Sequence, residues 1–476
     1  MMSSGRRGSV LRAGMLALAA AVLVLAGGAA GAAPAQGAKK SVSDQILEIL
    51  LEKKIITQEK YQDLRRQVLA EQAAREKAQE QQYRLKYRPA KGLALEQNHG
   101  SNSIALTGRL QLDAKAFTSH SGDNASFFVR RARIAARVKW YKYFRAFVEL
   151  EMGKGKTGLN DGFLEIYWRP SLRLRFGQFK QPFSLEEMHS DNWTWTMERS
   201  LADSLVPSRD IGFMVHGSLA QDALYYAFSV YNGGGKNHAS DTDGSKDLAG
   251  RVVAAPLRWA GGGVFQDFYL GAAATWGNQD ATAGDWWRGG KLVTAAGNTW
   301  FLVDPSVRQN GARTRLGGEV FWSVGPVAFM GELARTDFDG LDLEGDTYDL
   351  SLWGGYAMFS WLITGEHAGF KGGKPSAIRP RRNFELGQGR GWGAWQAVLR
   401  YDWLKADSGW RDYGLVNSAA YADQARGWTV GLNWYLNDMV RCMVNFFDYR
   451  FEQPVIIHSL AVDKEQGFLG RIQIVY

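Results

Sequence analysis

The stretch "FFVRRARIAARVKW", residues 127–140, alternates between apolar and basic side chains along most of its length. The even positions carry Phe128, Ala132, Ile134, Ala136, Val138 and Trp140, and the odd positions carry Arg131, Arg133, Arg137 and Lys139. A period of two places these sets on opposite faces of a β-strand. One face therefore suits hydrocarbon and the other suits ion-bearing water. Arg130 is a charge at an even position, which we expect near the external rim of the strand.

The same alternation runs from Ser103 to the last residue. Strands of membrane barrels have about ten residues and alternate apolar and polar side chains. Candidate strands fall near 103–117, 127–140, 143–152, 160–168, 172–180, 210–219, 223–232, 248–257, 267–277, 313–324, 326–337, 347–365, 391–404, 427–437, 440–452 and 467–476. The pattern predicts an all-β fold over residues 100–476, a 16-stranded antiparallel transmembrane β-barrel.

The connections between these strands alternate in length. Tight turns are expected at 141–142, 169–171, 325–326 and 437–438, and long loops at 181–209, 278–312 and 405–426. Short periplasmic turns and long external loops are typical of outer-membrane barrels. Residues 366–390 break the rule, because their place in the order predicts a short periplasmic turn.

The N-terminus predicts export. Arg6, Arg7 and Arg12 flank an apolar run that ends in small residues, so residues 1–32 are interpreted as a signal peptide with a cleavage site near Ala30 and Ala32. An uncleaved anchor helix is the alternative. Export together with a transmembrane barrel predicts that the mature chain lies in the bacterial outer membrane.

Residues 40–95 are predicted to form a periplasmic helical hairpin or coiled coil with a linker. Residues 43–82 carry helical periodicity, with Tyr61, Leu64 and Val68 on one face and Thr57 as a cap for the second helix. Residues 70–100 are polar, and a disordered linker is the alternative for them.

The chain has 476 residues, 55 glycines, 11 prolines and 18 tryptophans, with a formal charge of +9. Abundant glycine and aromatic residues with scarce proline favour a sheet protein with many turns and aromatic anchors at a membrane interface. Cys442 is the single cysteine, which excludes an intrachain disulfide framework.

The face opposite the apolar one collects most of the charged residues, and arginine dominates it. The inward basic residues are Arg109, Lys115, Arg131, Arg133, Arg137, Lys139, Arg145, Arg173, Arg175, Arg251, Arg313, Arg315, Arg400, Arg441 and Arg471. The inward acidic residues are fewer, namely Asp113, Glu149, Glu151, Glu165, Glu319, Glu332 and Asp402. A lumen lined in this way repels cations and concentrates anions. Pairing with lumen carboxylates is the alternative role for any single arginine.

Catalysis, cofactors and metals are not expected. The seven histidines are scattered, no G-x-S-x-G or H-E-x-x-H motif is present, and His216 falls on an apparently lipid-facing position. The basic composition would suit a nucleic-acid partner, but the signal peptide and the sorting of arginines onto one face argue against that.

Three segments carry a resemblance to a known family. They are "FFVRRARIAARVKWYKYFRAFVELEMG", "LNDGFLEIYWRPSLRLRFGQFKQPFSLEEMHSDNWTWTMERSLADSLVPSRDIGFMVHG" and "FSWLITGEHAGFKGGKPSAIRPRRNFELGQGRGWGAWQAVLRYDWL". With "GLNWYLNDMVRCMVNFF" after them, they resemble the phosphate-selective porin O and P family over roughly residues 100–476. The G-Q-F-K-x-P-F-S-x-E-E, M-E-R-S and T-G-E-H elements carry the match.

The resemblance implies a barrel that is usually trimeric and carries anions such as phosphate past an arginine ladder to a narrow constriction. The third external loop, 181–209, would supply Lys180, Glu186, Glu187, Arg199 and Arg209 to the constriction. The long turn 366–390 would fold inward with Lys371, Lys374, Arg379, Arg381, Arg382 and Arg390. The sequence departs from the family pattern in Glu186, Glu187 and Asp191, since acids at the throat would oppose a phosphate site.

The predicted function is an outer-membrane porin, a passive diffusion channel that prefers anions, with phosphate or polyphosphate as candidate solutes. Its expected partners are membrane lipid, inorganic anions and two further copies of itself, with cell-wall contact through the N-terminal helices. The alternative is a general porin, or a structural barrel tethered through those helices, without phosphate selectivity.

Overall fold

The computed structural model describes residues 42–81, 83–97, 100–118, 124–155, 157–238, 241, 244–258, 263–285, 289–385, 387 and 391–476. The chain divides into two compact units, one ending at Gln79 and one spanning Glu80–Tyr476. The predicted signal peptide and Arg390 lie outside the described residues.

The first unit contains two helices, α2 (Val42–Glu52) and α3 (Gln58–Gln81). The predicted cap is confirmed, because the backbone N–H of Lys60 donates to Oγ1 of Thr57 at 3.3 Å. Leu47 and Tyr61 are buried, whereas Ile46 and Ile49 are about half exposed. Among the described helices, none combines the length and apolarity needed to cross a membrane.

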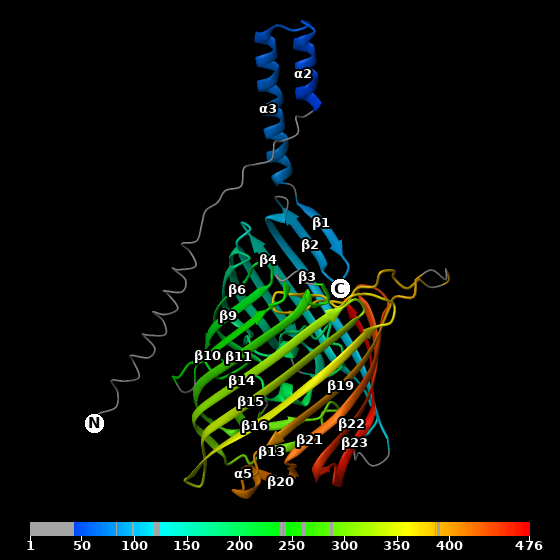
Figure 1. Ribbon diagram of the computed structural model, residues 1–476. Helices are drawn as coiled ribbons and strands as arrows, with labels where there is room; N and C mark the ends of the chain where they lie inside the picture. The colour runs from blue at the N-terminus through cyan, green and yellow to red at the C-terminus, as the bar shows by residue number, and fades with distance from the viewer. Residues whose placement is uncertain are drawn as a thin grey trace, which may run out of the picture. The chain divides into compact units, whose positions relative to one another are not determined.

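The second unit is a closed antiparallel barrel of sixteen strands (Figure 1). Its strands are β3 (Asn102–Phe117), β4 (Ser126–Trp140), β5 (Phe144–Glu151), β6 (Gly158–Arg169), β7 (Leu172–Lys180), β8 (Arg209–Leu219), β9 (Leu224–Tyr231), β10 (Asp247–Ala254), β11 (Asp267–Thr282), β14 (Arg308–Val324), β15 (Val327–Leu343), β16 (Asp346–Leu362), β19 (Ala394–Ala406), β21 (Gln424–Tyr435), β22 (Val440–Ile457) and β23 (Leu460–Val475). Pairing of β23 with β3 closes the ring, so no edge is left between the first and last strands. The predicted fold is confirmed.

The two faces of the wall separate as the alternation predicts. On β23, Phe468 and Ile472 are 49% and 60% exposed, whereas Arg471 between them is 2% exposed. The same contrast holds on the other strands, where exposed Leu, Val, Ile, Phe and Trp side chains alternate with buried polar ones. A charge on the lipid face at the bilayer midplane would cost about 2–4 kcal/mol, which explains the sorting.

A β-bulge in β4 changes the two-face assignment of the opening stretch. Gln111 on β3 faces Arg131 and Leu112 faces Val129, which leaves Arg130 as an extra residue. The bulge reverses the parity, so that Phe127 is 91% exposed and Phe128 turns toward the interior. The predicted outward position of Phe128 was therefore wrong. Arg130, predicted near the external rim, lies beside the external cap residues 293–297 but points inward to Glu198.

A short hairpin extends the sheet beside β3. Its strands are β1 (Arg84–Arg88) and β2 (Gly92–Gln97), and β2 pairs with β3 through Leu93 opposite Leu106. These residues fall in the stretch interpreted as linker, because strands of 5 and 6 residues are too short to establish a period of two from sequence. The hairpin lies at the same end of the barrel as the C-terminus (Figure 1).

The connections at the opposite end form a folded cap. Loop residues 283–307 and 407–423 contribute β12 (Lys291–Val293), β13 (Thr299–Val303), β20 (Val416–Tyr421) and α5 (Gly409–Asp412), and the three strands form a small sheet. Trp300, Phe301 and Trp410 in this cap are fully buried. At the end with short turns, β17 (Phe370–Lys371) and β18 (Lys374–Pro375) pair within the long turn 363–393.

Candidate functional site: the barrel lumen

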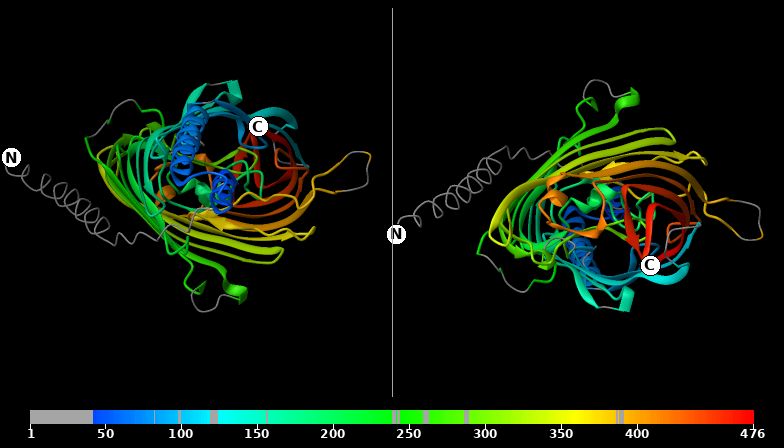
Figure 2. Two further views of the ribbon diagram at one scale, coloured as in Figure 1. Left: turned by 90° about the horizontal axis from the view of Figure 1, so that it is seen from above. Right: turned by 90° about the horizontal axis from the view of Figure 1, so that it is seen from below.

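The ring of strands encloses further segments of chain, seen in views along the barrel (Figure 2). One of them is the loop 181–208, with α4 (Leu185–Met188) and the 3-10 turn Leu201–Ser204. Wall side chains on β14 to β22 bind its backbone: Asn433 and Arg441 donate to the carbonyls of Trp195 and Thr194, and Arg315 donates to the carbonyl of Leu205. The loop thus lies along one side of the lumen.

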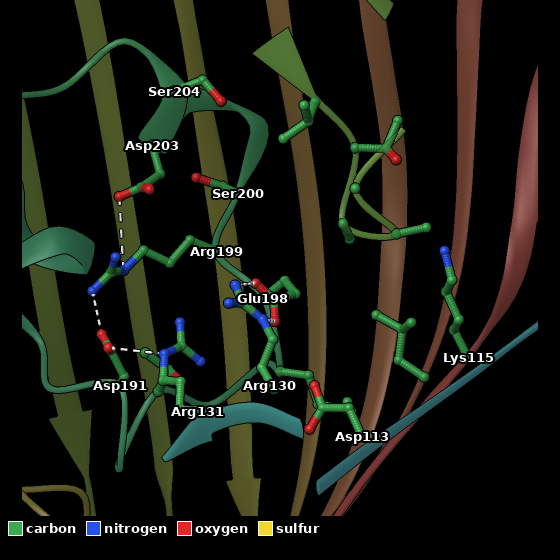
Figure 3. A pocket seen from close by; sticks show the side chains of 18 of the residues that line it. Asp113, Lys115, Arg130, Arg131, Asp191, Glu198, Arg199, Ser200, Asp203 and Ser204 are labelled. Atoms are coloured by element: carbon green, nitrogen blue, oxygen red, sulfur yellow. Dashed lines mark hydrogen bonds and ion pairs between the residues drawn. The ribbon is translucent and has the colours of Figure 1, made fainter. Parts of the chain in front are cut away.

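Asp191 connects this loop to the arginines of the opening stretch. Its Oδ2 lies 3.2 Å from Nε of Arg131, and its Oδ1 lies 2.7 Å from Nη2 of Arg199 (Figure 3). Oδ2 also lies 3.1 Å from Nη2 of Arg133. Burial opposes ionisation of Asp191, but these three guanidinium groups outweigh it and hold the pKa of Asp191 well below its usual range. Asp191 is therefore a buried anion that is held by cations on both sides.

Glu198 forms a second link on the same wall. Arg130, the bulge residue, donates to Glu198 through Nε and Nη2 at 2.8 and 2.7 Å. Arg471 on β23 also reaches Glu198 at 2.9 Å and pairs with Asp113 at 2.7 Å. The bulge in β4 thus supplies an additional inward cation that a regular strand would have pointed at lipid.

Glu186 and Glu187 do not present free charge to the throat. Glu186 accepts from the backbone N–H and Oγ of Ser200 at 3.0 and 2.7 Å and lies 3.4 Å from Nη1 of Arg400. Glu187 pairs with Arg199 and lies 3.5 Å from Nζ of Lys180. Both carboxyl groups are about 1–2% exposed, and burial raises the pKa of Glu186 to about 7.

The expected conflict between these acids and an anion path is therefore not supported. The carboxylates stabilise the folded loop inside the barrel and are enclosed by protein, so they contribute little negative charge to lumen water. Sequence alone does not distinguish a throat-lining acid from a loop anchor, because the difference depends on the path of the loop.

A second segment, residues 367–378, enters the lumen from the end with short turns. Its tip is a two-residue hairpin, Gly372 and Gly373, with φ of +58° and +74°, the conformation that Gly-Gly favours between paired strands. Phe370 stacks on Tyr269 at 4.1 Å, and the carbonyl of Gly373 accepts from Arg251 at 2.6 Å. β18 contacts α4, so the two inner segments meet.

The T-G-E-H element forms the base of this turn. Oγ1 of Thr364 donates to Glu366 and accepts from the N–H of Trp395, and Glu366 accepts from the N–H of Arg381 at 3.1 Å. His367 lies 3.1 Å from Asp267 on β11. The motif therefore directs the turn inward rather than contacting solute.

The predicted cations of this turn separate into two groups. Lys374 is exposed to the lumen near Lys180 and Arg175, and Lys371 lies on the same hairpin. Arg379 instead pairs with Asp438 at 3.7 Å, and the N–H of Phe384 donates to the carbonyl of Leu436, so residues 379–384 follow the barrel rim. Arg379 therefore lies at the rim and not inside the pore, and the contribution of Arg381 and Arg382 to the anion path stays a prediction.

The free side of the lumen, opposite the anchored loop, carries arginines stacked on aromatic rings. Arg137 lies 5.2 Å from the ring of Phe147, Arg175 lies 4.2 Å from Phe163, and Arg145 and Arg173 lie 3.7 and 4.7 Å from Tyr167. We call these four arginines the stacked arginines. Stacking uses the face of a guanidinium, so the edge N–H donors that do not bind Glu165 stay available to an oxyanion.

Carboxylates are scarce around the stacked arginines. Glu165 is shared by Arg175 at 2.5 Å, Arg145 at 3.7 Å and His216 at 3.1 Å. Arg137 and Arg173 form no ion pair with any residue that the structure describes. His216 faces the interior, which corrects its predicted lipid-facing position.

The remaining predicted lumen residues contact other groups of the protein. Four arginines form ion pairs: Arg109 with Glu149, Arg133 with Glu149 and Glu151, Arg209 with Asp161, and Arg400 with Asp402. Lys139 donates to the carbonyl of Gly100, and Arg313 donates to Gln279. Lys115 lies over the ring of Phe117. The alternative expectation for single arginines, pairing with lumen carboxylates, describes most of this set.

Three residues of the lumen were not predicted from the sequence as site residues: Phe147, Phe163 and His189. Phe147 and Phe163 occupy inward positions on β5 and β6, where an apolar ring at an inward parity position was the available signal. His189 is 1% exposed with neither ring nitrogen hydrogen-bonded to a described residue, and burial lowers its pKa to about 3. Beside the anchored loop, a cavity of about 320 Å³ is lined by Lys115, Arg130, Thr194 and the tip 293–297 of the external cap.

The profile of the Phosphate-selective porin O and P family matches residues 104–453. The chain belongs to this family. An uncharacterized protein of Caulobacter vibrioides is 27% identical to the porin over 382 residues, which cover 75% of this chain and 71% of the relative.

Solved structures share the barrel fold with the porin at low identity. They include an anion-selective porin from Comamonas acidovorans (TM-score 0.50, 10% identity, 79% of this chain and 100% of that chain) and the outer membrane channel DcaP of Acinetobacter baumannii (TM-score 0.50, 9% identity, 79% and 98%). The trimer form of OmpT from Vibrio cholerae matches equally (TM-score 0.50, 9% identity, 79% and 100%). Family and fold are those of an outer-membrane channel.

Proposed function

We propose that the porin is a passive channel that prefers small anions, phosphate among them, and that anions pass between the stacked arginines and Lys374. The stacked arginines carry the proposal, because four guanidinium groups lie on the open side of the lumen and Glu165 pairs with only two of them, Arg145 and Arg175. Guanidinium forks match the geometry of phosphate oxygens.

Lys374 would complete the constriction from the inner hairpin. Enclosure in the barrel and the charges of Lys180 and Arg175 lower the pKa of Lys374 to about 8. The charged form of Lys374 is destabilised by the neighbouring cations, and a bound anion would stabilise it by offsetting that repulsion. The anion selectivity of the Comamonas acidovorans porin, which shares the barrel fold, is consistent with this solute class.

Export through residues 1–32 and assembly as a homotrimer belong to the same proposal. The exposed apolar wall supports membrane insertion, and the trimer form of OmpT shows that a barrel of this fold assembles in that way. Contact of the N-terminal helices with the cell wall remains a prediction.

The test is the reversal potential of the purified porin in planar bilayers under a potassium chloride gradient. We expect a reversal potential that is shifted from zero toward the equilibrium potential of chloride. We also expect added phosphate to block the chloride current in a concentration-dependent manner. A reversal potential of the cationic sign would refute anion preference, and chloride current that is insensitive to phosphate would refute a phosphate site while leaving anion preference intact.

A further inference from the structure

A row of basic side chains crosses three neighbouring strands on the outer face of the barrel. Arg426 on β21 lies directly opposite Arg450 on β22, and Arg450 lies directly opposite Lys464 on β23. The side chains of Arg450 and Lys464 are 69% and 40% exposed, and Arg426 is exposed as well. We call these three residues the outer basic row. They point away from the lumen, so anion transport gives them no role.

Like charges directly opposite each other destabilise a sheet, and the outer basic row has two such pairs in succession. Asp448 lies 3.1 Å from Nζ of Lys464 and 3.9 Å from Nε of Arg450, and it also accepts from Gln466 at 3.0 Å. Arg426 forms no ion pair within the described part of the chain. Asp448 therefore contacts two of the three cations, and Arg426 is left without a carboxylate partner among the described residues.

Further charges lie around the row on the same outer surface. Lys405 on β19 is exposed and adds positive charge, whereas Glu452 and Asp463 are exposed acids beyond the row, away from the apolar band. Neither acid forms an ion pair with the outer basic row. The cations therefore remain only partly compensated by the protein.

The outer basic row lies at the edge of the lipid-facing band. The next register row toward the membrane holds Tyr401 and Trp428, whose rings are 4.7 Å apart, followed by the apolar pair Phe446 and Phe468. Aromatic girdles mark the two interfaces of a membrane barrel. The row is on the side of the long loops, which is the external side, so it lies at the depth of outer-leaflet headgroups.

We propose that the outer basic row binds the phosphate groups of a lipid headgroup in the outer leaflet. Neighbouring strands are about 4.8 Å apart, so the three side chains span about 10 Å of headgroup surface. Guanidinium groups can hold phosphate oxygens in a bidentate manner, and the anion would remove the repulsion between Arg426, Arg450 and Lys464. Charge complementarity and continuity with the lipid-facing wall select a lipid as the occupant.

The test is the binding of bisphosphorylated lipid A to the full-length porin in detergent, followed by native mass spectrometry. The combined variant Arg426→Gln, Arg450→Gln and Lys464→Gln removes the charges and keeps side-chain polarity. We expect the dissociation constant to rise about fivefold for each charge removed. Wild-type porin should bind dephosphorylated lipid A as weakly as the variant does.

Arg335→Gln is the matched control. Arg335 also lies on the outer face toward the external end, with its side chain 60% exposed and Trp353 directly opposite. Unlike Arg426, it is paired with a carboxylate, Asp337, at 2.8 Å. The substitution should leave lipid binding unchanged. If the combined variant does not fold, as judged by heat-modifiable gel mobility, a salt titration of the wild type substitutes, since headgroup binding should weaken with ionic strength.

Four outcomes would overturn the proposal. The first is equal affinity of wild type and variant for lipid A, and the second is equal affinity of the wild type for lipid A and for the dephosphorylated lipid. The third is a change in trimer stability without a change in lipid binding, which would assign the row to contact with a second copy. The fourth is displacement of lipid A by inorganic phosphate alone, which would assign the row to free anion. Bilayer conductance is independent of all these results, so it reports separately on the proposed function.

Discussion

Asp191 in the inner loop lies 3.2 Å from Arg131 in the wall strand β4, with its side chain 8% exposed. This contact assigns the first arginine of the alternating stretch to loop anchoring. Arg137, six residues further along the same face, stacks on Phe147 beside open lumen. The inward arginines of β4 therefore have two roles. Arg131 holds the inner loop in place, and Arg137 faces the open lumen.

Replacing Asp191 with Asn should destabilise the barrel. The change leaves Arg131, Arg133 and Arg199 without their shared anion, and breaking a buried pair from one side costs about 3–5 kcal/mol. Denaturant unfolding in lipid vesicles would measure this loss. Asp346→Asn, at the exposed external start of β16, is the control and should stay within about 0.5 kcal/mol of wild type.

Neutralising Arg137 should weaken anion preference without loss of stability. Arg137→Gln removes a lumen charge that has no carboxylate partner among the described residues. The interaction of one exposed charge with a permeating anion is worth up to about 1 kcal/mol, so we expect the anion-to-cation permeability ratio to fall about two- to fivefold. Arg400→Gln is the contrast, because it breaks buried contacts with Glu186 and Asp402 and should lower stability. The same permeability ratio in Arg137→Gln and wild type would remove Arg137 from the path.

Anion preference should fall as pH rises from about 7 to 9. Lys374 is charged below its lowered pKa of about 8 and loses that charge as the pH passes through it. Lys374→Arg keeps the charge throughout this range, so its reversal potential should be flat. Equal pH dependence in the two proteins would assign the titration to another group.

Removing the ring of Phe370 should release the inner hairpin. Phe370→Ala deletes stacking on Tyr269 at 4.1 Å and on Phe321 at 4.9 Å, contacts worth about 0.5–1.5 kcal/mol each beyond burial. Single-channel recordings should show a larger and noisier conductance. Phe384→Ala, which removes a ring packed on Trp434 at the rim, should not change conductance.

Deleting residues 42–79 should leave the barrel folded and conducting. These residues form the compact unit that ends at Gln79, whereas β2 pairs with β3 and must be kept. A deletion extended to residue 95 would expose the edge of β3 and should impair assembly. Intact conductance with weakened cell-envelope integrity would support tethering by the N-terminal helices, and lost conductance would give them a role in the channel.

Local pattern determined the barrel. The period-two alternation, the even number of strands, the unequal connections and the helical N-terminal segment are all properties of neighbouring residues, because each strand faces lipid on one side wherever it sits in the ring. The over-long turn at 366–390 was also visible as an exception in length. Family resemblance added the expectation that it folds inward.

Tertiary structure alone decided which charges are free. Whether Glu186 faces solute or is enclosed depends on the fold of its own loop at Ser200 and on Arg400, which is 214 residues away in sequence. Whether Arg131 or Arg137 meets an anion depends on where the inner loop lies. The bulge at Arg130 likewise arises from strand pairing, which no single strand encodes. Side-chain parity follows from covalent geometry, but the pairing of charges follows from the closed packing of distant segments.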